Sequence, residues 1–359
     1  MKILHLLLVQ VGEATLKVFV YNETIVPELV VFLQNSPICK EHVFGSEVLI
    51  PEYIAEHLQW TTTDWTQADL FYVPMNIACI YYANARSNST SMDEDLLHSM
   101  QQHLDAILYS LPYYRPGRRN HVFNLFFKGL FPGWRIKLKD AIILTPETEV
   151  EFEISSKYFE SDCRIEGEFP PYDATRDIVI PPYMHISHLQ LFASHAQINR
   201  PWLVSFFGKR WIDVDEGINV RQRMIDVFSQ RSDSYIHAVD TVSKFVPLTF
   251  VADIMGKSKF CLIPRGRSAW TTRFYDAWWA GCIPIVLSDY FVLPFAPTSV
   301  NPKLVMIQWP TSSIDSSFID YLESLSVDDI NKFQAEIVKV RHIFVYPTAI
   351  ETLLRNLSA

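Results

Sequence analysis

The stretch SKFCLIPRGRSAWTTRFYDAWWAGCIPIVLSDY, from Ser258 to Tyr290, decides the fold of this chain. Residues 259–263 are a short apolar run that predicts a buried strand. Residues 271–280 have the apolar spacing of a helix and are followed by Gly281, a residue typical of a helix C-cap. Residues 282–287 predict a second buried strand. The stretch therefore predicts a βαβ unit.

The turn between the first strand and the helix is basic and contains a glycine, which lets the backbone approach a ligand closely. Free backbone N–H groups at the helix start and nearby guanidinium groups suit an anion, above all a diphosphate. Arg273 and Asp276 share one helix face, so they could contact phosphate and ribose hydroxyls, or simply form a surface ion pair. The donor-binding candidates of this half of the chain are Arg210, Arg265, Gly266, Arg267, Ser268, Arg273 and Asp276.

This segment resembles the nucleotide-sugar-binding core of the exostosin family, the family-47 glycosyltransferases. The resemblance rests on Arg273, on Asp276 and on the blocks at residues 260–264, 281–284, 288–289 and 293–295. Other blocks extend it along most of the chain, at residues 17–21, 68–74, 117–125 and 200–210. One position departs from the family pattern, because the family usually has Glu where this chain has Asp276.

The resemblance implies an α/β fold of the GT-B type, in which two Rossmann-type domains face each other across a cleft. The length of 359 residues agrees, because it exceeds what one hydrophobic core usually supports. We expect an N-terminal, acceptor-side domain at residues 1–195 and a C-terminal, nucleotide-sugar-binding domain at residues 196–359. A last helix around residues 327–344 is expected to cross back to the first domain.

The activity implied by the resemblance is inverting transfer of a sugar from a UDP-sugar to a hydroxyl of a glycan or glycoprotein. The PRGR turn at residues 264–267 is closer to glucuronosyl-transferring exostosins than to plant relatives, which ranks UDP-glucuronate slightly above UDP-galactose and UDP-xylose. Such a reaction needs a base to take the acceptor proton. Ligands of open α/β sheets sit beyond the carboxyl ends of strands, so Glu147, just past the strand expected at residues 141–144, is the first candidate. His185 and His121 rank below it.

A metal or other cofactor is not expected. The motif Asp213-Val214-Asp215 could hold a divalent cation, but it lies in a charged, glycine-containing segment typical of a solvated loop. The arginines already named can stabilise a departing diphosphate without a metal. The five cysteines show no spacing typical of a zinc site. Cys261 and Cys282 fall on apolar segments and are expected to be small buried hydrophobic residues, and the odd count leaves at least one thiol unpaired.

Charge limits the partners. The formal net charge of -9 predicts a surface that repels polyanions, which excludes nucleic acid as a partner. An acidic glycan acceptor would need a local basic track, which Arg115, Arg118 and Arg119 could supply, whereas a neutral glycan would not. The resemblance is also compatible with a hetero- or homo-oligomer that contains another exostosin-like subunit.

The resemblance further implies a type II membrane protein with its catalytic domain in the Golgi or ER lumen. Residues 3–11 are apolar but far shorter than the roughly 20 residues that span a bilayer, so we expect the anchor to be missing or degenerate here. Glycosylation sequons at Asn22, Asn88 and Asn356 fit a lumenal domain.

Two other classes of function stay open. The chain could be a catalytically inactive partner subunit or chaperone of an active transferase, which the Asp at position 276 and the short amino terminus motivate. It could also be another nucleotide-binding α/β enzyme, such as an epimerase or dehydrogenase. The lack of a G-x-G-x-x-G motif after a strand counts against that reading.

Overall fold

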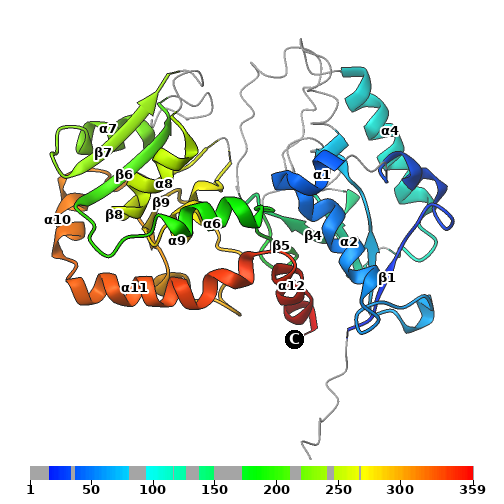
Figure 1. Cartoon of the computed structure of the whole chain (residues 1–359). Coiled ribbons are helices and arrows are strands. Elements are labelled where there is room, and N and C mark those ends of the chain that lie inside the picture. The colour runs from blue at the N-terminus through cyan, green and yellow to red at the C-terminus, as the bar shows by residue number, and fades with distance from the viewer. Residues whose placement is uncertain are drawn as a thin grey trace, which may run out of the picture.

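The computed structural model describes residues 16–33, 37–80, 94–115, 117–126, 137–148, 172–210, 220–240, 246–266 and 268–358. These residues form two parallel sheets with helices around them, one in each half of the chain (Figure 1). This confirms the α/β, GT-B-like architecture that the sequence predicts. None of the helices that the structure describes is long and apolar enough to cross a membrane.

The first sheet has its strands side by side in chain order, β1-β2-β3-β4-β5. The strands are short and almost wholly buried, as expected for a parallel sheet that is covered on both faces. They are β1 (Val18–Val20), β2 (Leu70–Val73), β3 (His121–Asn124), β4 (Ile142–Thr145) and β5 (Asp177–Val179). The described α-helices of this half are α1 (Pro37–Glu41), α2 (Ser46–Glu56) and α4 (Glu94–Ser110).

The second sheet has the order β10-β9-β8-β6-β7, so its strand order reverses between β6 and β8. Its strands are β6 (Trp202–Lys209), β7 (Ser234–Val239), β8 (Ser258–Pro264), β9 (Ile283–Leu287) and β10 (Ile307–Gln308). The described α-helices of this half are α7 (Val220–Phe228), α8 (Leu248–Gly256), α9 (Arg273–Trp279), α10 (Ser316–Ser324), α11 (Val327–Val340) and α12 (Thr348–Ser358). A reversal of this kind places a ligand crevice beyond the carboxyl ends of the two strands.

The βαβ unit predicted from residues 258–290 is β8, α9 and β9. Gly281 follows the C-cap residue of α9 and has a φ of +68°, a conformation that other residues adopt only with strain. A Cβ atom at this position would also lie 2.5 Å from Nη2 of Arg200. The prediction of a C-cap glycine is therefore confirmed, for both backbone and packing reasons.

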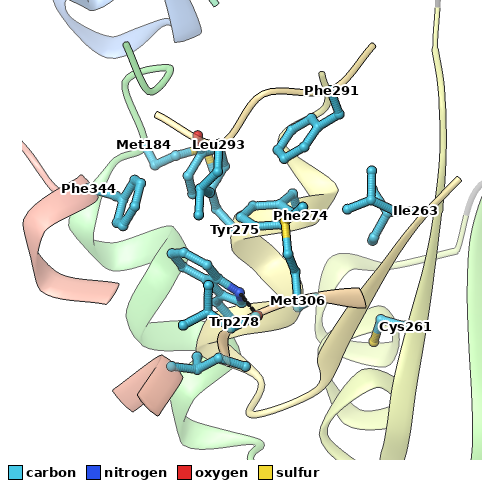
Figure 2. Close-up of a cluster of buried hydrophobic side chains, with 14 of the residues drawn as sticks. Met184, Cys261, Ile263, Phe274, Tyr275, Trp278, Phe291, Leu293, Met306 and Phe344 are labelled. Atoms are coloured by element: carbon cyan, nitrogen blue, oxygen red, sulfur yellow. Dashed lines mark hydrogen bonds between the residues drawn. The ribbon is translucent and has the colours of Figure 1, made fainter. Parts of the chain in front are cut away.

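The buried face of α9 is strongly aromatic and anchors the helix in the core. Phe274, Tyr275 and Trp278 pack there with Phe344 and Leu293, among others (Figure 2). The indole nitrogen of Trp278 donates a hydrogen bond to the carbonyl of Val305 at 3.0 Å, so burial leaves this polar group satisfied. This packing anchors α9 in the core, while Arg273 at the start of the helix stays about one-third exposed.

Two helices connect the halves. α6 (Ile186–Ser194) follows β5 in the chain but packs against α8 and α9 of the second half. α12 returns to the first half, where Glu351 accepts a hydrogen bond from the hydroxyl of Tyr53 at 2.8 Å. The expectation placed the crossing helix at residues 327–344, but α11 packs against α9 and β9 of the second half. The crossing helix is α12.

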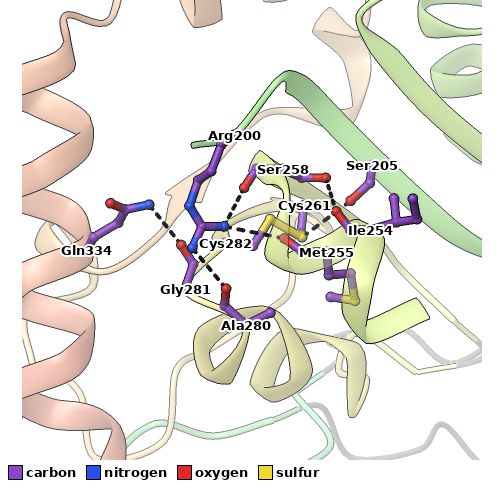
Figure 3. Close-up of a disulfide and its surroundings, with 10 residues drawn as sticks. All are labelled: Arg200, Ser205, Ile254, Met255, Ser258, Cys261, Ala280, Gly281, Cys282 and Gln334. Atoms are coloured by element: carbon purple, nitrogen blue, oxygen red, sulfur yellow. Dashed lines mark hydrogen bonds between the residues drawn. A yellow bond between two sulfur atoms is a disulfide. The ribbon is translucent and has the colours of Figure 1, made fainter. Parts of the chain in front are cut away.

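The sequence predicts Cys261 and Cys282 to be small buried hydrophobic residues and leaves their disulfide pairing open. Both are buried, as expected, but they form a disulfide that links β8 to the segment entering β9 (Figure 3). A second disulfide joins Cys39 to Cys79 in the first half. Strand pairing explains the first bridge, since Cys261 and Pro284 are register partners and bring Cys282 within reach. Cys163 lies outside the described residues.

Arg200 reinforces the same corner of the fold. Its guanidinium donates to the carbonyls of Ser258 at 2.8 Å and Ala280 at 3.0 Å, and therefore ties the start of β8 to the end of α9 (Figure 3). Burial lowers the pKa of this arginine to about 10. The βαβ unit is thus fastened covalently and by buried hydrogen bonds.

Candidate functional site

A cavity of about 310 Å³ opens at the carboxyl ends of β6 and β8, where the strand order of the second sheet reverses. Its apolar wall includes Phe206, Phe207 and Leu248. Its polar wall includes His188, Arg221, Thr271, Thr272, Arg273 and Asp276. The cavity has the position, the size and the mixed polar and apolar lining that are typical of a small-molecule site in an α/β protein.

The polar wall is organised around Asp276. Its side chain is almost fully buried, and its two carboxylate oxygens accept hydrogen bonds from different elements. Oδ1 accepts from Nε2 of His188 at 2.7 Å, and Oδ2 accepts from Nη1 of Arg273 at 3.1 Å. The charge of the carboxylate is therefore compensated within the protein, while the side chains of Arg273 and His188 remain about one-third exposed at the cavity.

The turn after β8 lies beside this cavity. Its backbone is held by hydrogen bonds from Arg265 N to the carbonyl of Leu287 and from Gly266 N to the carbonyl of Ser268. A Cβ atom at Gly266 would meet nothing closer than 3.8 Å, so the backbone there is open to a neighbouring group. Arg267, a predicted donor contact, lies outside the described residues.

Arg221 is a cavity residue that sequence reasoning missed. From α7 its guanidinium donates to the carbonyl of Lys209 at 2.6 Å and to the carbonyl of Arg265 at 3.1 and 3.2 Å. It therefore joins the turn after β6 to the turn after β8. The only signal in the sequence is that it lies on the helix that follows β6, since no motif marks it.

Arg210 is not among the cavity residues. It follows β6, and its guanidinium pairs with Asp240, beyond the end of β7, at 3.4 Å. Arg273 and Asp276 of the predicted donor set therefore lie together in the cavity wall, and Arg221 in the same wall donates a hydrogen bond to the carbonyl of Arg265.

Glu147, the first candidate for the base, is fully buried at the junction of the two halves. Its Oε1 accepts a hydrogen bond from Oγ of Ser268, on the turn after β8, at 3.0 Å. The adjacent Thr148 donates from Oγ1 to the carbonyl of Tyr290. Glu147 lies just beyond β4, as the sequence predicts, and its carboxylate holds the turn after β8.

The two candidate histidines are placed differently. His185 is exposed and caps α6, where its Nδ1 accepts from the backbone N–H of Ser187 at 3.2 Å. His121 opens β3, at the end of the first sheet opposite the carboxyl ends, and is buried. Both of its ring nitrogens are hydrogen-bonded, to Tyr21 and Asn120, and burial lowers its pKa to about 4. The structure therefore does not bring His121 to the cavity.

His188, and not the candidate His185, lines the cavity. It lies three residues further along α6, on the face that carries Phe192 one turn later and that packs towards α9. The helical period predicts that His188 and Phe192 share one face of α6, because residues i and i+4 lie on the same side of a helix. It could not show which element α6 packs against.

A second buried carboxylate lies in the first half. Glu47 of α2 accepts hydrogen bonds from the backbone N–H groups of Ala78 at 3.1 Å and Cys79 at 3.2 Å. Burial raises its pKa to about 8. Glu47 therefore has a structural role, because it holds the backbone beside the Cys39–Cys79 disulfide.

Within the described ranges, no group of three or more His, Cys, Asp or Glu side chains is placed to hold a metal ion. Asp213 and Asp215 lie outside those ranges.

Comparison with known proteins identifies relatives of this chain. A model of the Exostosin GT47 domain matches residues 12–311. A probable glucuronoxylan glucuronosyltransferase of Arabidopsis thaliana is 24% identical over 77% of this chain and 55% of its own length. A probable β-1,4-xylosyltransferase of the same plant is 25% identical over 86% of this chain and 70% of its own length. The N-terminal domain of Candida albicans trehalose-6-phosphate phosphatase is similar with a TM-score of 0.43 and 8% identity, over 97% of each chain.

Proposed function

Because the chain belongs to the exostosin GT47 family of glycosyltransferases, we propose that it transfers a sugar from a UDP-sugar to a hydroxyl of a glycan or glycoprotein, with inversion at the anomeric carbon. The observation that carries the proposal is the cavity at the β6–β8 reversal, with Arg273 exposed in its wall. The chain spans 55% of the length of the glucuronosyltransferase it matches.

The proposed donor site uses both walls of the cavity. The uridine packs against the apolar wall of Phe206, Phe207 and Leu248, and the diphosphate lies against the guanidinium of Arg273. The hydroxyl groups of Thr271 and Thr272 add neutral donors. Arg273 suits a phosphate because its planar fork offers two parallel N–H groups, and Asp276 holds that fork in place.

For the transferred sugar we propose a UDP-glucuronate donor slightly ahead of neutral UDP-sugars. A uronic acid needs a cation beside its carboxylate, and Arg265 lies on the turn that borders the cavity. The relatives include both a probable glucuronosyltransferase and a probable xylosyltransferase, so a panel of donors is the informative experiment.

We place the protein in the Golgi or ER lumen. Two disulfides among the described residues support an oxidising compartment, because cytosolic proteins rarely keep such bonds.

Calorimetric titration of the purified protein with UDP tests the proposal, followed by hydrolysis assays with UDP-glucuronate, UDP-galactose, UDP-xylose and UDP-N-acetylglucosamine. UDP binding together with turnover of one of these donors supports a transferase. UDP binding without turnover would favour an inactive partner subunit, and no UDP binding would contradict the assignment of the cavity.

A further inference from the structure

His188 is held at the cavity by contacts that select one orientation of its ring. The residue lies in the first turns of α6, and its imidazole packs against Phe192 with ring centroids 5.1 Å apart. Nε2 lies 2.7 Å from Oδ1 of Asp276, which α9 presents from the other side. Two packed elements therefore fix the ring, and the part that remains exposed lines the cavity.

The hydrogen bond to Asp276 also determines the tautomer. A carboxylate can only accept, so Nε2 carries the proton, and in the neutral ring Nδ1 is then the unprotonated nitrogen. Among the residues that the structure describes, Nδ1 of His188 has no hydrogen-bond partner. The ring is thus a proton acceptor that is oriented by a buried carboxylate, in a cavity that also exposes an arginine for phosphate.

We propose that His188 is the base that takes the acceptor proton in the transfer reaction, an inference that rests on the proposed function. As the acceptor oxygen forms its bond to the anomeric carbon, its proton moves to Nδ1 of His188. The bond between the anomeric carbon and the diphosphate oxygen breaks, and its electron pair leaves with UDP beside Arg273. The imidazolium is stabilised by Asp276 and then returns its proton to solvent.

This assignment differs from a role for Glu147. The carboxylate of Glu147 is fully buried and already accepts from Ser268, whereas the side chain of His188 is about one-third exposed in the cavity wall. Asp276 acts through its two partners and is a positioning residue for both His188 and Arg273. One carboxylate thus links the group that receives a proton to the group that holds the leaving diphosphate.

His188→Gln separates a base from a positioning residue. A glutamine amide nitrogen can reach the position of Nε2 and keep the hydrogen bond to Asp276, but it provides no counterpart to the basic Nδ1. We expect His188→Gln to bind UDP within about threefold of the wild type and to lower kcat for hydrolysis of the preferred UDP-sugar by about a hundredfold or more, since general bases contribute roughly 10²–10⁴-fold. His195→Gln, at the other end of α6 and outside the cavity lining, is the matched control and should retain wild-type kcat.

A second variant, His188→Ala, tests the same role independently in case His188→Gln does not fold. In His188→Ala, added imidazole should restore part of the hydrolysis, because a small external base can enter the space of the ring. The proposal is overturned if His188→Gln keeps kcat within about threefold, if it loses UDP affinity in parallel with kcat, or if imidazole gives no rescue. Turnover by the wild type that is abolished in Glu147→Gln and unchanged in His188→Gln would assign the base to Glu147 and leave the transferase function standing. A wild type that neither binds UDP nor turns over any donor would instead remove the proposed function itself.

Discussion

Oγ of Ser268, on the turn after β8, donates a hydrogen bond to Oε1 of Glu147, just beyond β4, at 3.0 Å. These residues come from different halves of the chain, so one hydrogen bond to a buried carboxylate connects the first sheet to the turn that borders the cavity. The neighbouring contact between Thr148 and the carbonyl of Tyr290 crosses the same junction. The relative position of the two halves is therefore coupled to the geometry of the proposed donor site.

The first prediction follows from this contact. Ser268→Ala should lower the free energy of unfolding by about 1–2 kcal/mol, because it removes a hydrogen bond to a buried carboxylate. Urea denaturation measures the change. Ser268→Thr keeps the hydroxyl and should remain close to the wild type. An alanine variant that unfolds at the wild-type urea concentration would show that the contact contributes nothing to stability.

The second prediction concerns the diphosphate. Arg273→Ala should weaken UDP binding by roughly ten- to a hundredfold, since a hydrogen bond to a charged group is worth about 1.5–3 kcal/mol. Calorimetry measures the affinity, and Arg355→Ala, an exposed arginine on α12, is the control. Normal UDP affinity in Arg273→Ala would exclude this residue as the phosphate ligand. Asp276 keeps its hydrogen bond from His188 in this variant, so the fold should persist.

The third prediction concerns metal. The proposed site neutralises the leaving diphosphate with guanidinium groups, so UDP binding and donor hydrolysis should survive excess EDTA. The measurement is donor hydrolysis before and after EDTA treatment, with manganese added back. If activity disappears with EDTA, returns with manganese and is abolished by Asp215→Ala, then a metal ion and not arginine neutralises the diphosphate.

The fourth prediction concerns the stability of the protein at acidic pH. Burial lowers the pKa of His121 to about 4 from an unfolded value of 6.5, so the unfolded chain binds this proton first as the pH falls. The contribution of His121 to stability is therefore intact above about pH 6.5 and is lost progressively towards pH 4. The loss approaches about 3 kcal/mol, from about 1.36 kcal/mol for each pKa unit.

Comparison with His121→Gln isolates this effect. The variant lacks the titrating ring, so its free energy of unfolding should depend less on pH between about 6.5 and 4 than that of the wild type. Urea denaturation across this range measures both slopes. Equal slopes would show that another group controls the acid sensitivity.

The βαβ unit at residues 258–290 could be predicted because its signals are local. Apolar runs define the two strands, helical spacing defines α9, and Gly281 is needed where the backbone turns to a positive φ. The same local pattern places Arg273 and Asp276 on one helix face, and their hydrogen bond confirms that placement. Family membership could be recognised for the same reason, since its motifs are short and continuous.

The contacts that complete the candidate site join segments far apart in the chain. His188 and Asp276 are 88 positions apart, and Glu147 and Ser268 are 121 apart. The choice of His188 over His185 depends on which side of α6 packs against α9, and helical spacing alone does not determine the partner element.

The sequence by itself determined the α/β class, the family and the helix that carries Arg273, because periodicity and turn chemistry act over a few neighbouring residues. Only the tertiary structure decided the Cys261–Cys282 disulfide, the return of α12 to the first half and the link from Asp276 to His188. These features arise when the two cores pack and bring distant side chains within bonding distance. A local sequence pattern does not determine that packing.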